Sequence, residues 1–454
     1  MTAPLRVPPP PGPALPFVLP RFEGTLLPSG LAVRAARWGR RPTVAAAILF
    51  PGAGSTADPA GHEGTADVTG DTFLGGTRTK SARQLAEALD DLAAVAEVSA
   101  GTDSTVARLF VLESDLQAGL ALLAEILTEA TFPEEEFEKG RRRLIATLQE
   151  QRSEPDFLAR ERLYDRLYPG HPYGIVTPTE KGLLALTRDD VVDFARRRLS
   201  LRGATLVLGG STDPAKLLAA AERAFGGLPG AAGEPGSTVP PPPRVSGFSI
   251  HLVNRPGSVQ TNLLFARPAL PRKSPRFPAA VVANQTLGGG ASSRLFHVLR
   301  EERGLTYGAY SSLSTRVLGG HFGASIDCRT EVTEAALAGL LGLIRAFAAE
   351  GPNPEEHERS KAYLLGSFPI PRETPGGVVQ DEITRLLHGL PEDEFTTWRD
   401  RIRAVTREEA RDAARDLFDP ATGIVAAVGD ADRIRPILEA HGETTLWDAD
   451  GPRS

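Results

Sequence analysis

The sequence predicts an α+β protein of two homologous domains, each a mostly antiparallel sheet covered by helices, joined by a linker rich in proline and glycine. Three observations support this fold class. The chain has 454 residues, more than one hydrophobic core usually organises. Residues 226–245 carry too much glycine and proline to pack into a core, and they divide the chain near its middle. Finally, sequence patterns on one side of this linker recur on the other side.

The clearest repeat joins a helix to a strand. ALTRDDVVDFARRRL begins at Ala185 and AVTREEARDAARDLF begins at Ala404, a separation of 219 positions. In each copy a threonine can cap a helix, and an acidic residue follows three positions later. The same separation aligns the strand predicted over 204–208 with a segment that begins near Thr422. We therefore predict an N-terminal arm over 1–21, a domain over 22–225, the linker over 226–245 and a second domain over 246–445.

Residue patterns define the remaining elements of the first half. Residues 30–38 and 42–50 are predicted strands, and the second is apolar enough for the middle of a sheet. Ser81 can cap a helix over 81–92, whose leucines repeat at helical spacing. Strands over 95–99 and 105–112 follow, and then helices over 116–131 and 132–152. Another helix begins at Thr187.

Composition excludes several classes of function. A net charge of −6 gives no reason to expect nucleic acid as a partner. The single cysteine, Cys328, excludes an internal disulfide and a cluster of thiolates around zinc. Prolines throughout the arm oppose a signal-peptide helix, and no run approaches the roughly 18 apolar residues of a membrane span. We therefore expect a cytoplasmic protein that binds no membrane.

One stretch carries the strongest chemical signal. Residues 288–311 begin with three glycines, continue as a helix with a buried apolar stripe, and reach Gly304, where a left-handed residue commonly ends a helix. Arg300 lies in the last turn of that helix, and Tyr307 follows at the start of a strand. Such a pair can bind a carbonyl or carboxylate and stabilise negative charge. The spacing equally allows a solvated arginine and a half-buried core tyrosine.

The segment GGGASSRLFHVLREERGLTYGAYSS resembles the C-terminal-domain signature of the pitrilysin and mitochondrial-processing-peptidase family, the inverted-motif zinc metallopeptidases. The resemblance extends over roughly Phe22 to Gly442 and implies two homologous α+β domains. It also implies that Arg300 and Tyr307 form the pair that reaches toward the zinc site in that family. The glycines at 288, 289 and 290 are then candidates for close approach of a substrate backbone.

The zinc motif of that family is absent from the corresponding segment of this chain. Active members carry H-x-x-E-H on a helix of the first domain, where two histidines bind zinc and the glutamate activates water. Here the matching positions hold Asp67, Gly70 and Asp71, and the third ligand position falls at Thr147. Two carboxylates suit magnesium or calcium better than zinc, and we favour two exposed acids on a degenerate helix. The scattered histidines offer no other metal site.

The absence of the zinc motif, together with the presence of Arg300 and Tyr307, implies a specific function through the resemblance. In heterodimeric members of the family one subunit brings zinc and the other brings the arginine–tyrosine pair. We therefore predict a subunit that binds no cofactor itself, pairs with a zinc-bearing homologue, and helps it bind extended peptides. Tyr307 would donate to the oxyanion, and Arg300 would orient that tyrosine or hold the substrate carbonyl. The alternative is a catalytically silent scaffold or peptide-binding protein of the same fold. A peptidase with a new metal site of its own is the least favoured interpretation.

Overall fold

The computed structural model describes residues 16–230, 239–243 and 245–449, and these form two α+β halves. Most of the predicted arm (residues 1–15) and the middle of the predicted linker (231–238 and 244) lie outside the described residues. Each half contains one six-stranded sheet, so the predicted fold class is confirmed. The last strand ends at Asp448, slightly beyond the predicted domain boundary at 445.

The two sheets repeat one topology over five of their six strands, and the remaining edge strand comes first in the first half and last in the second. The first has the order β1-β2-β6-β3-β5-β4, and the second β12-β7-β11-β8-β10-β9. In the first sheet β2 and β6 are parallel and the other neighbours antiparallel. In the second, β7 is parallel to β11 and β12, and the other neighbours are antiparallel. The strands of the first sheet are β1 Glu23–Leu26, β2 Ala32–Arg37, β3 Thr43–Pro51, β4 Val95–Ala100, β5 Ser104–Leu112 and β6 Thr205–Gly210. Those of the second are β7 Phe248–Asn254, β8 Gln260–Ala269, β9 Thr306–Thr315, β10 Gly320–Arg329, β11 Gly423–Gly429 and β12 Thr444–Asp448.

The helices also follow the duplication. The predicted pair appears as α7 (Arg188–Arg198) and α15 (Arg407–Phe418), each opened by a capping box at the expected threonine. The other helices of the first half are α1 Thr65–Thr72, α2 Ala82–Asp91, α3 Leu116–Glu129, α4 Glu134–Ser153, α5 Pro155–Leu167, α6 Glu180–Ala185 and α8 Pro214–Phe225. Those of the second half are α9 Phe277–Gly288, α10 Arg294–Phe296, α11 Thr333–Glu350, α12 Pro354–Ser367, α13 Pro375–Leu387, α14 Trp398–Ala404 and α16 Ala431–Glu439.

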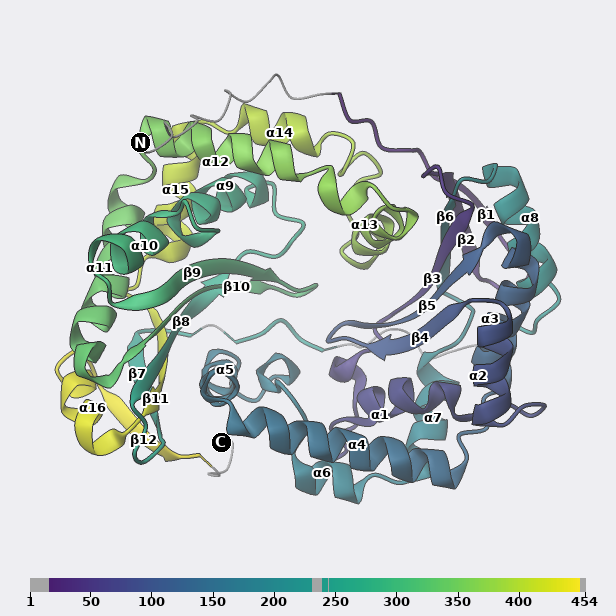
Figure 1. The fold of residues 1–454 in the computed structure, drawn as a ribbon, viewed down its shortest axis with the longest axis horizontal. Helices are drawn as coiled ribbons and strands as arrows, with labels where there is room; N and C mark the ends of the chain where they lie inside the picture. Colours follow the sequence, from purple (N-terminus) through teal and green to yellow (C-terminus); the bar gives the residue numbers. More distant parts are fainter. Residues whose placement is uncertain (1–15, 231–238, 244, 450–454) are drawn as a thin grey trace, which may run out of the picture.

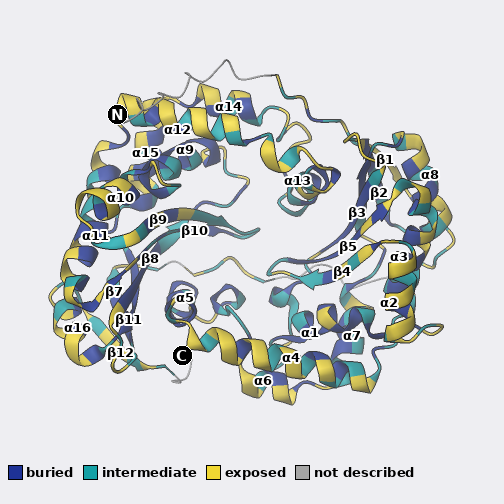
Figure 2. Ribbon diagram, in the orientation of Figure 1, coloured by how far each residue is buried: buried dark blue, intermediate teal, exposed yellow. Residues whose placement is uncertain are grey.

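Each sheet buries one face against helices of its own half, and these helices form the outside of the molecule (Figure 1). Their outward faces are exposed while the strands behind them are buried (Figure 2). The segment Thr330–Glu350, which contains helix α11, is long and apolar enough to cross a membrane by length and composition alone. It buries Leu337, Ile344 and Phe347 in the core of the second half, which accounts for that composition.

The two halves exchange one helix each, an arrangement that the predicted domain boundaries did not contain. Helix α5 of the first half packs its Leu158 and Leu163 against Leu264 and Val428 of the second sheet. Helix α13 of the second half packs Val379 and Ile383 against the first sheet. Both helices have 13 residues and begin with a proline, so they are equivalent elements of the duplicated unit. Each sheet is therefore covered on its inner face by a helix from the opposite half (Figure 1).

Polar contacts fix the halves together. Asp103, in the β4–β5 hairpin, accepts from the Tyr173 hydroxyl at 2.7 Å and from the Val317 backbone N–H of the β9–β10 hairpin at 3.0 Å. On the opposite side, Arg34 of β2 forms an ion pair with the buried Glu382 of α13. The described end of the arm packs Phe17 and Leu19 against aromatic and aliphatic side chains of the second half. These contacts leave the chain a single packed body.

Candidate functional site

The segment that resembles the zinc helix is helical in the structure. Helix α1 covers residues 65–72 and starts at Gly64, which has a left-handed backbone and no side chain to cap the helix. Asp58 supplies the cap from a distance: its two carboxylate oxygens accept from the backbone N–H groups of Gly64 (2.7 Å) and Ala66 (2.8 Å). Positions 67, 70 and 71 all lie on this helix of about two turns, whose first turn Asp58 holds.

The positions aligned with the metal ligands do converge. Asp67 on α1 and Thr147 on α4 line the same cavity of about 320 Å³, although 80 residues separate them in sequence. Gly70 faces the edge strand β4, and a Cβ atom built on it would lie 3.0 Å from the Val98 carbonyl oxygen. A larger side chain at this position would require β4 or α1 to shift. The space for a general base between these elements is closed.

Asp71 is committed to an ion pair that the sequence analysis missed. The Arg143 guanidinium, on α4 one turn before Thr147, donates to both carboxylate oxygens of Asp71, at 2.5 and 3.3 Å. Asp71 is exposed, as predicted, although its carboxylate is ion-paired, whereas Asp67 is only partly exposed, so the prediction of two exposed acids was wrong for Asp67. The available signal was the spacing of Arg143, four residues before the third-ligand position on one helix face.

Asp67 holds its proton more tightly than a surface acid. Burial raises its pKa to about 6, and the negative charge of Asp71 adds to the effect. Burial likewise raises the pKa of Asp58, in the same corner, to about 7. With a guanidinium on Asp71 and no charge at Thr147, these residues do not fit zinc. The described residues include no group of three or more histidine, cysteine, aspartate or glutamate side chains arranged to hold a metal ion.

The arginine and tyrosine lie in the other half, on the second sheet. Arg300 belongs to a π-helical turn, residues 297–302, which follows α10, so the predicted helix is present and its last turns are π-helical. Gly304 has φ = +61°, as predicted for the residue after a helix end. Tyr307 lies on β9, the edge strand, and is 91% exposed, which contradicts the half-buried interpretation.

The two side chains do not contact each other. The Arg300 guanidinium stacks over the Phe296 ring, 4.6 Å from its centroid. Among the described residues neither Arg300 nor Tyr307 has a hydrogen-bond or ion-pair partner, so their polar groups are free to meet another molecule. Helix α1 and strand β9 lie in different halves, well apart (Figure 1). Tyr307 therefore has no access to the α1 region of its own chain.

The three glycines divide into two groups. A Cβ on Gly288 would lie 2.3 Å from the Ser311 backbone nitrogen, and one on Gly289 would lie 2.7 Å from the Gln285 Cα atom. Internal packing therefore requires glycine at these two positions, because α9 approaches β9 closely at Gly288 and Gly289 lies against Gln285 of α9 itself. Gly290 has only one atom within 4 Å of such a Cβ, at 3.7 Å. Of the three glycines, Gly290 is the one with space for an external group.

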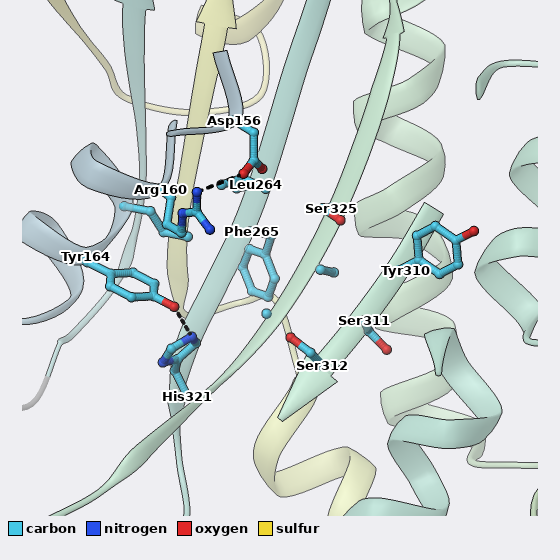
Figure 3. A pocket seen from close by; sticks show the side chains of 13 residues that line it. Asp156, Arg160, Tyr164, Leu264, Phe265, Tyr310, Ser311, Ser312, His321 and Ser325 are labelled. Carbon is cyan, nitrogen blue, oxygen red and sulfur yellow. Dashed lines mark hydrogen bonds and ion pairs between the residues drawn. The ribbon is translucent and has the colours of Figure 1, made fainter. Parts of the chain in front are cut away.

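A pocket lies between the exchanged helix α5 and the inner face of the second sheet (Figure 3). It has a volume of about 190 Å³ and is lined by Tyr164 of α5 and by Tyr310, His321 and Gly323 of the second sheet. His321 is buried and bridges the hydroxyls of Tyr164 (3.2 Å) and Tyr168 (3.0 Å). Sequence analysis counted His321 among the scattered histidines, since its neighbours come from the other half of the chain.

Comparison with protein families gives two matches. Residues 40–178 match the model described as Insulinase (Peptidase family M16), and residues 185–364 match the one described as Peptidase M16 inactive domain. An uncharacterised zinc protease of Streptomyces coelicolor is 24% identical over 422 residues, which covers 89% of this chain and 90% of the relative. A protein of Helicobacter pylori named non-peptidase homolog YmxG is 23% identical over 368 residues, covering 80% of this chain and 84% of the relative.

Solved structures share the fold. A structure described as the peptidase M16 inactive domain from Pseudomonas fluorescens superposes with a TM-score of 0.83 at 24% identity, covering 90% of this chain and 98% of the other. A protease from Helicobacter pylori superposes with a TM-score of 0.84 at 18% identity, covering 90% and 100% of the two chains. The likeness therefore extends over both halves.

Proposed function

The chain belongs to peptidase family M16, and we propose that within this family it acts as a subunit without zinc that completes the active site of a zinc-bearing homologue. The single observation that carries this proposal is the asymmetry between the halves. The positions aligned with the zinc motif hold Asp67, Gly70, Asp71 and Thr147, which do not fit zinc, and Arg143 neutralises Asp71. In the other half, Tyr307 projects from a sheet edge with 91% of its surface exposed.

Tyr307 would act on a substrate bound by the partner. Its phenol is a hydrogen-bond donor on an edge strand, and it has no partner among the described residues. Directed at the carbonyl oxygen of a peptide held at the partner's zinc, it would stabilise the oxyanion of the tetrahedral intermediate. Removing one such donor lowers turnover by roughly 10²–10³-fold.

Arg300 would bind the substrate rather than orient the tyrosine. Its guanidinium carbon lies 4.6 Å from the centroid of the Phe296 ring, a cation–π contact that holds the group beside this ring. In that position it supports a role in holding a peptide carbonyl. Edge strands such as β9 offer unpaired backbone groups, to which an extended peptide adds as a further strand. Peptides or unfolded segments are the substrate class, and we place the complex in the cytoplasm.

The test is reconstitution with a homologue from the same organism that has an intact H-x-x-E-H motif. The chain alone should cleave no peptide, and the mixture should cleave. In the mixture, Tyr307→Phe should lower turnover by at least about 100-fold. Tyr363→Phe is the matched control, because Tyr363 is also exposed (54%) but lies on α12, away from β9. Full activity of the Tyr307→Phe complex would remove the proposed catalytic role.

One observation favours a second candidate, a peptide-binding or scaffold protein without any catalytic role. The similar protein of Helicobacter pylori is named a non-peptidase homologue. In that case the chain would bind extended peptides, and no zinc-bearing homologue would gain activity from it. The reconstitution separates the two, since only the first candidate predicts turnover that depends on Tyr307.

A further inference from the structure

The pocket in front of His321 has the chemistry of a binding site for one side chain. Its volume of about 190 Å³ lies below the roughly 300–1,000 Å³ typical of sites for whole small molecules or cofactors. Figure 3 shows Tyr164 and His321 on one side, Tyr310 on the other, and the serines of β9 and β10 between them. An occupant would therefore lie against the rings of Tyr164 and His321, on a floor of small residues.

Gly323 creates the floor of the pocket. It lies in the interior of β10, where glycine is unfavourable and often marks close approach of another molecule. A Cβ added to Gly323 would meet its nearest neighbours at 3.7–3.8 Å, in ordinary contact, so internal packing does not require glycine. The neighbours on this face of β9 and β10 are Ser312, directly opposite, and Ser325. A larger side chain at 323 would fill the pocket without straining the strand.

The tyrosine–histidine cluster leaves one hydrogen-bond donor for the pocket. Burial, with the positive charge of Arg316, lowers the pKa of His321 to about 4, so the ring is neutral and has one N–H. Tyr168 is only 2% exposed, and among the described residues its hydroxyl has His321 Nδ1 as its one partner. A buried O–H must be used, so Tyr168 donates to Nδ1. His321 then donates from Nε2 to the Tyr164 oxygen, and the Tyr164 O–H is left to point into the pocket.

Charge in the pocket is already balanced. The two charged side chains that line it, Asp156 and Arg160, form an ion pair with each other at 3.2 Å. An uncharged occupant therefore fits better than an acidic or a basic one. The rings of Tyr164 and His321 favour an aromatic occupant, which packs edge-to-face or offset on tyrosine. The Tyr164 hydroxyl favours a hydrogen-bond acceptor at the end of the occupant's side chain.

We propose that this pocket binds a tyrosine side chain of an extended peptide, with the ring over Gly323 and the phenol oxygen accepting from Tyr164. This inference deepens the proposed function and rests on it for the peptide. Ser312, the β9 residue directly opposite Gly323, lies five residues beyond Tyr307, which corresponds to about 17 Å along a strand. The tyrosine would thus lie about five residues from the peptide bond that Tyr307 addresses, and the pocket would set a sequence preference there.

The experiment measures binding to the full chain alone, without the zinc-bearing homologue. The probes are three capped pentapeptides that differ only in a central tyrosine, phenylalanine or alanine, titrated by calorimetry or ligand-observed NMR. We expect the tyrosine peptide to bind at least about 10-fold tighter than the alanine peptide. It should bind about 5-fold tighter than the phenylalanine peptide, the ratio expected for one neutral hydrogen bond.

Two variants make the assignment specific. Gly323→Val should reduce tyrosine and phenylalanine binding to the alanine level, and Tyr164→Phe should remove only the difference between tyrosine and phenylalanine. Gly342→Ala, at an exterior position with no atom within 4 Å of the added Cβ, is the matched control and should change nothing. Circular dichroism melts confirm that each variant is folded.

Equal binding of the three peptides, or tyrosine binding that survives Gly323→Val, would overturn the assignment. Tyrosine binding without turnover in the reconstituted complex would keep the pocket and reject the proposed function. Turnover in the reconstituted complex without a preference for the tyrosine peptide would support the proposed function and reject the assignment of the pocket.

Discussion

Replacing Asp67 by asparagine should stabilise the protein at neutral pH and leave it unchanged in acid. The folded-state pKa of Asp67 is about 6, against about 3.9 for an unfolded aspartate. Between these values the folded chain keeps a proton that the unfolded chain releases, so Asp67 costs stability increasingly as pH rises through this window. Below about pH 4 both states are protonated and the cost vanishes. Above about pH 6 the cost is complete.

The size of the effect follows from the pKa difference. About two pKa units correspond to about 3 kcal/mol in full, and partial solvent access to the cavity reduces this to about 1–2 kcal/mol. For a domain of roughly 200 residues, 1 kcal/mol shifts the melting temperature by about 2–4 °C. We therefore expect Asp67→Asn to melt about 2–8 °C higher than the parent at pH 7.5 and within about 1 °C of it at pH 4.

Differential scanning calorimetry at the two pH values measures this directly. Asp71→Asn, one turn along the same helix, is the control, because the loss of its ion pair with Arg143 offsets the smaller relief that it gives to Asp67. It should melt at the same temperature as the parent or slightly lower at pH 7.5. If Asp67→Asn destabilised the protein equally at both pH values, Asp67 would not be the desolvated acid described here.

Three further predictions concern the exchanged helix and the glycines. Ile383→Ala, on the buried face of α13, should destabilise the protein by about 2–5 kcal/mol and expose the α13 region to limited proteolysis; unchanged cleavage would show that α13 does not hold the halves together. Glu382→Gln leaves the Arg385 guanidinium without its carboxylate partner and leaves Arg34 only Glu392, so it should cost about 3 kcal/mol in urea unfolding, whereas a neutral result would contradict the ion-pair geometry. Gly288→Ala should cost about 1–3 kcal/mol through overpacking while Gly290→Ala changes the melting temperature little, and equal effects would refute the distinction between them.

Local sequence signals predicted the duplicated framework well, because they depend on nearest neighbours. The capping threonines Thr187 and Thr406 and the glycine after the π-helical turn each act within one turn of chain, and all three lie where predicted. The exchange of α5 and α13 depends on long-range packing. The sequence of a 13-residue amphipathic helix does not indicate which of the two sheets it packs against. The segment aligned with the zinc motif was identified through a family resemblance. The ion pair between Asp71 and Arg143 depends on the directions of side chains from two helices, which the sequence does not give. The pocket at His321 joins residues from both halves and has no local pattern.

Metal analysis of the isolated chain tests the central asymmetry most directly. After dialysis against a micromolar excess of zinc and removal of free metal, the account predicts far less than one zinc per chain, and no change with Asp67→Asn. One zinc per chain that is lost on Asp67→Asn, together with peptide cleavage by the isolated chain, would contradict it.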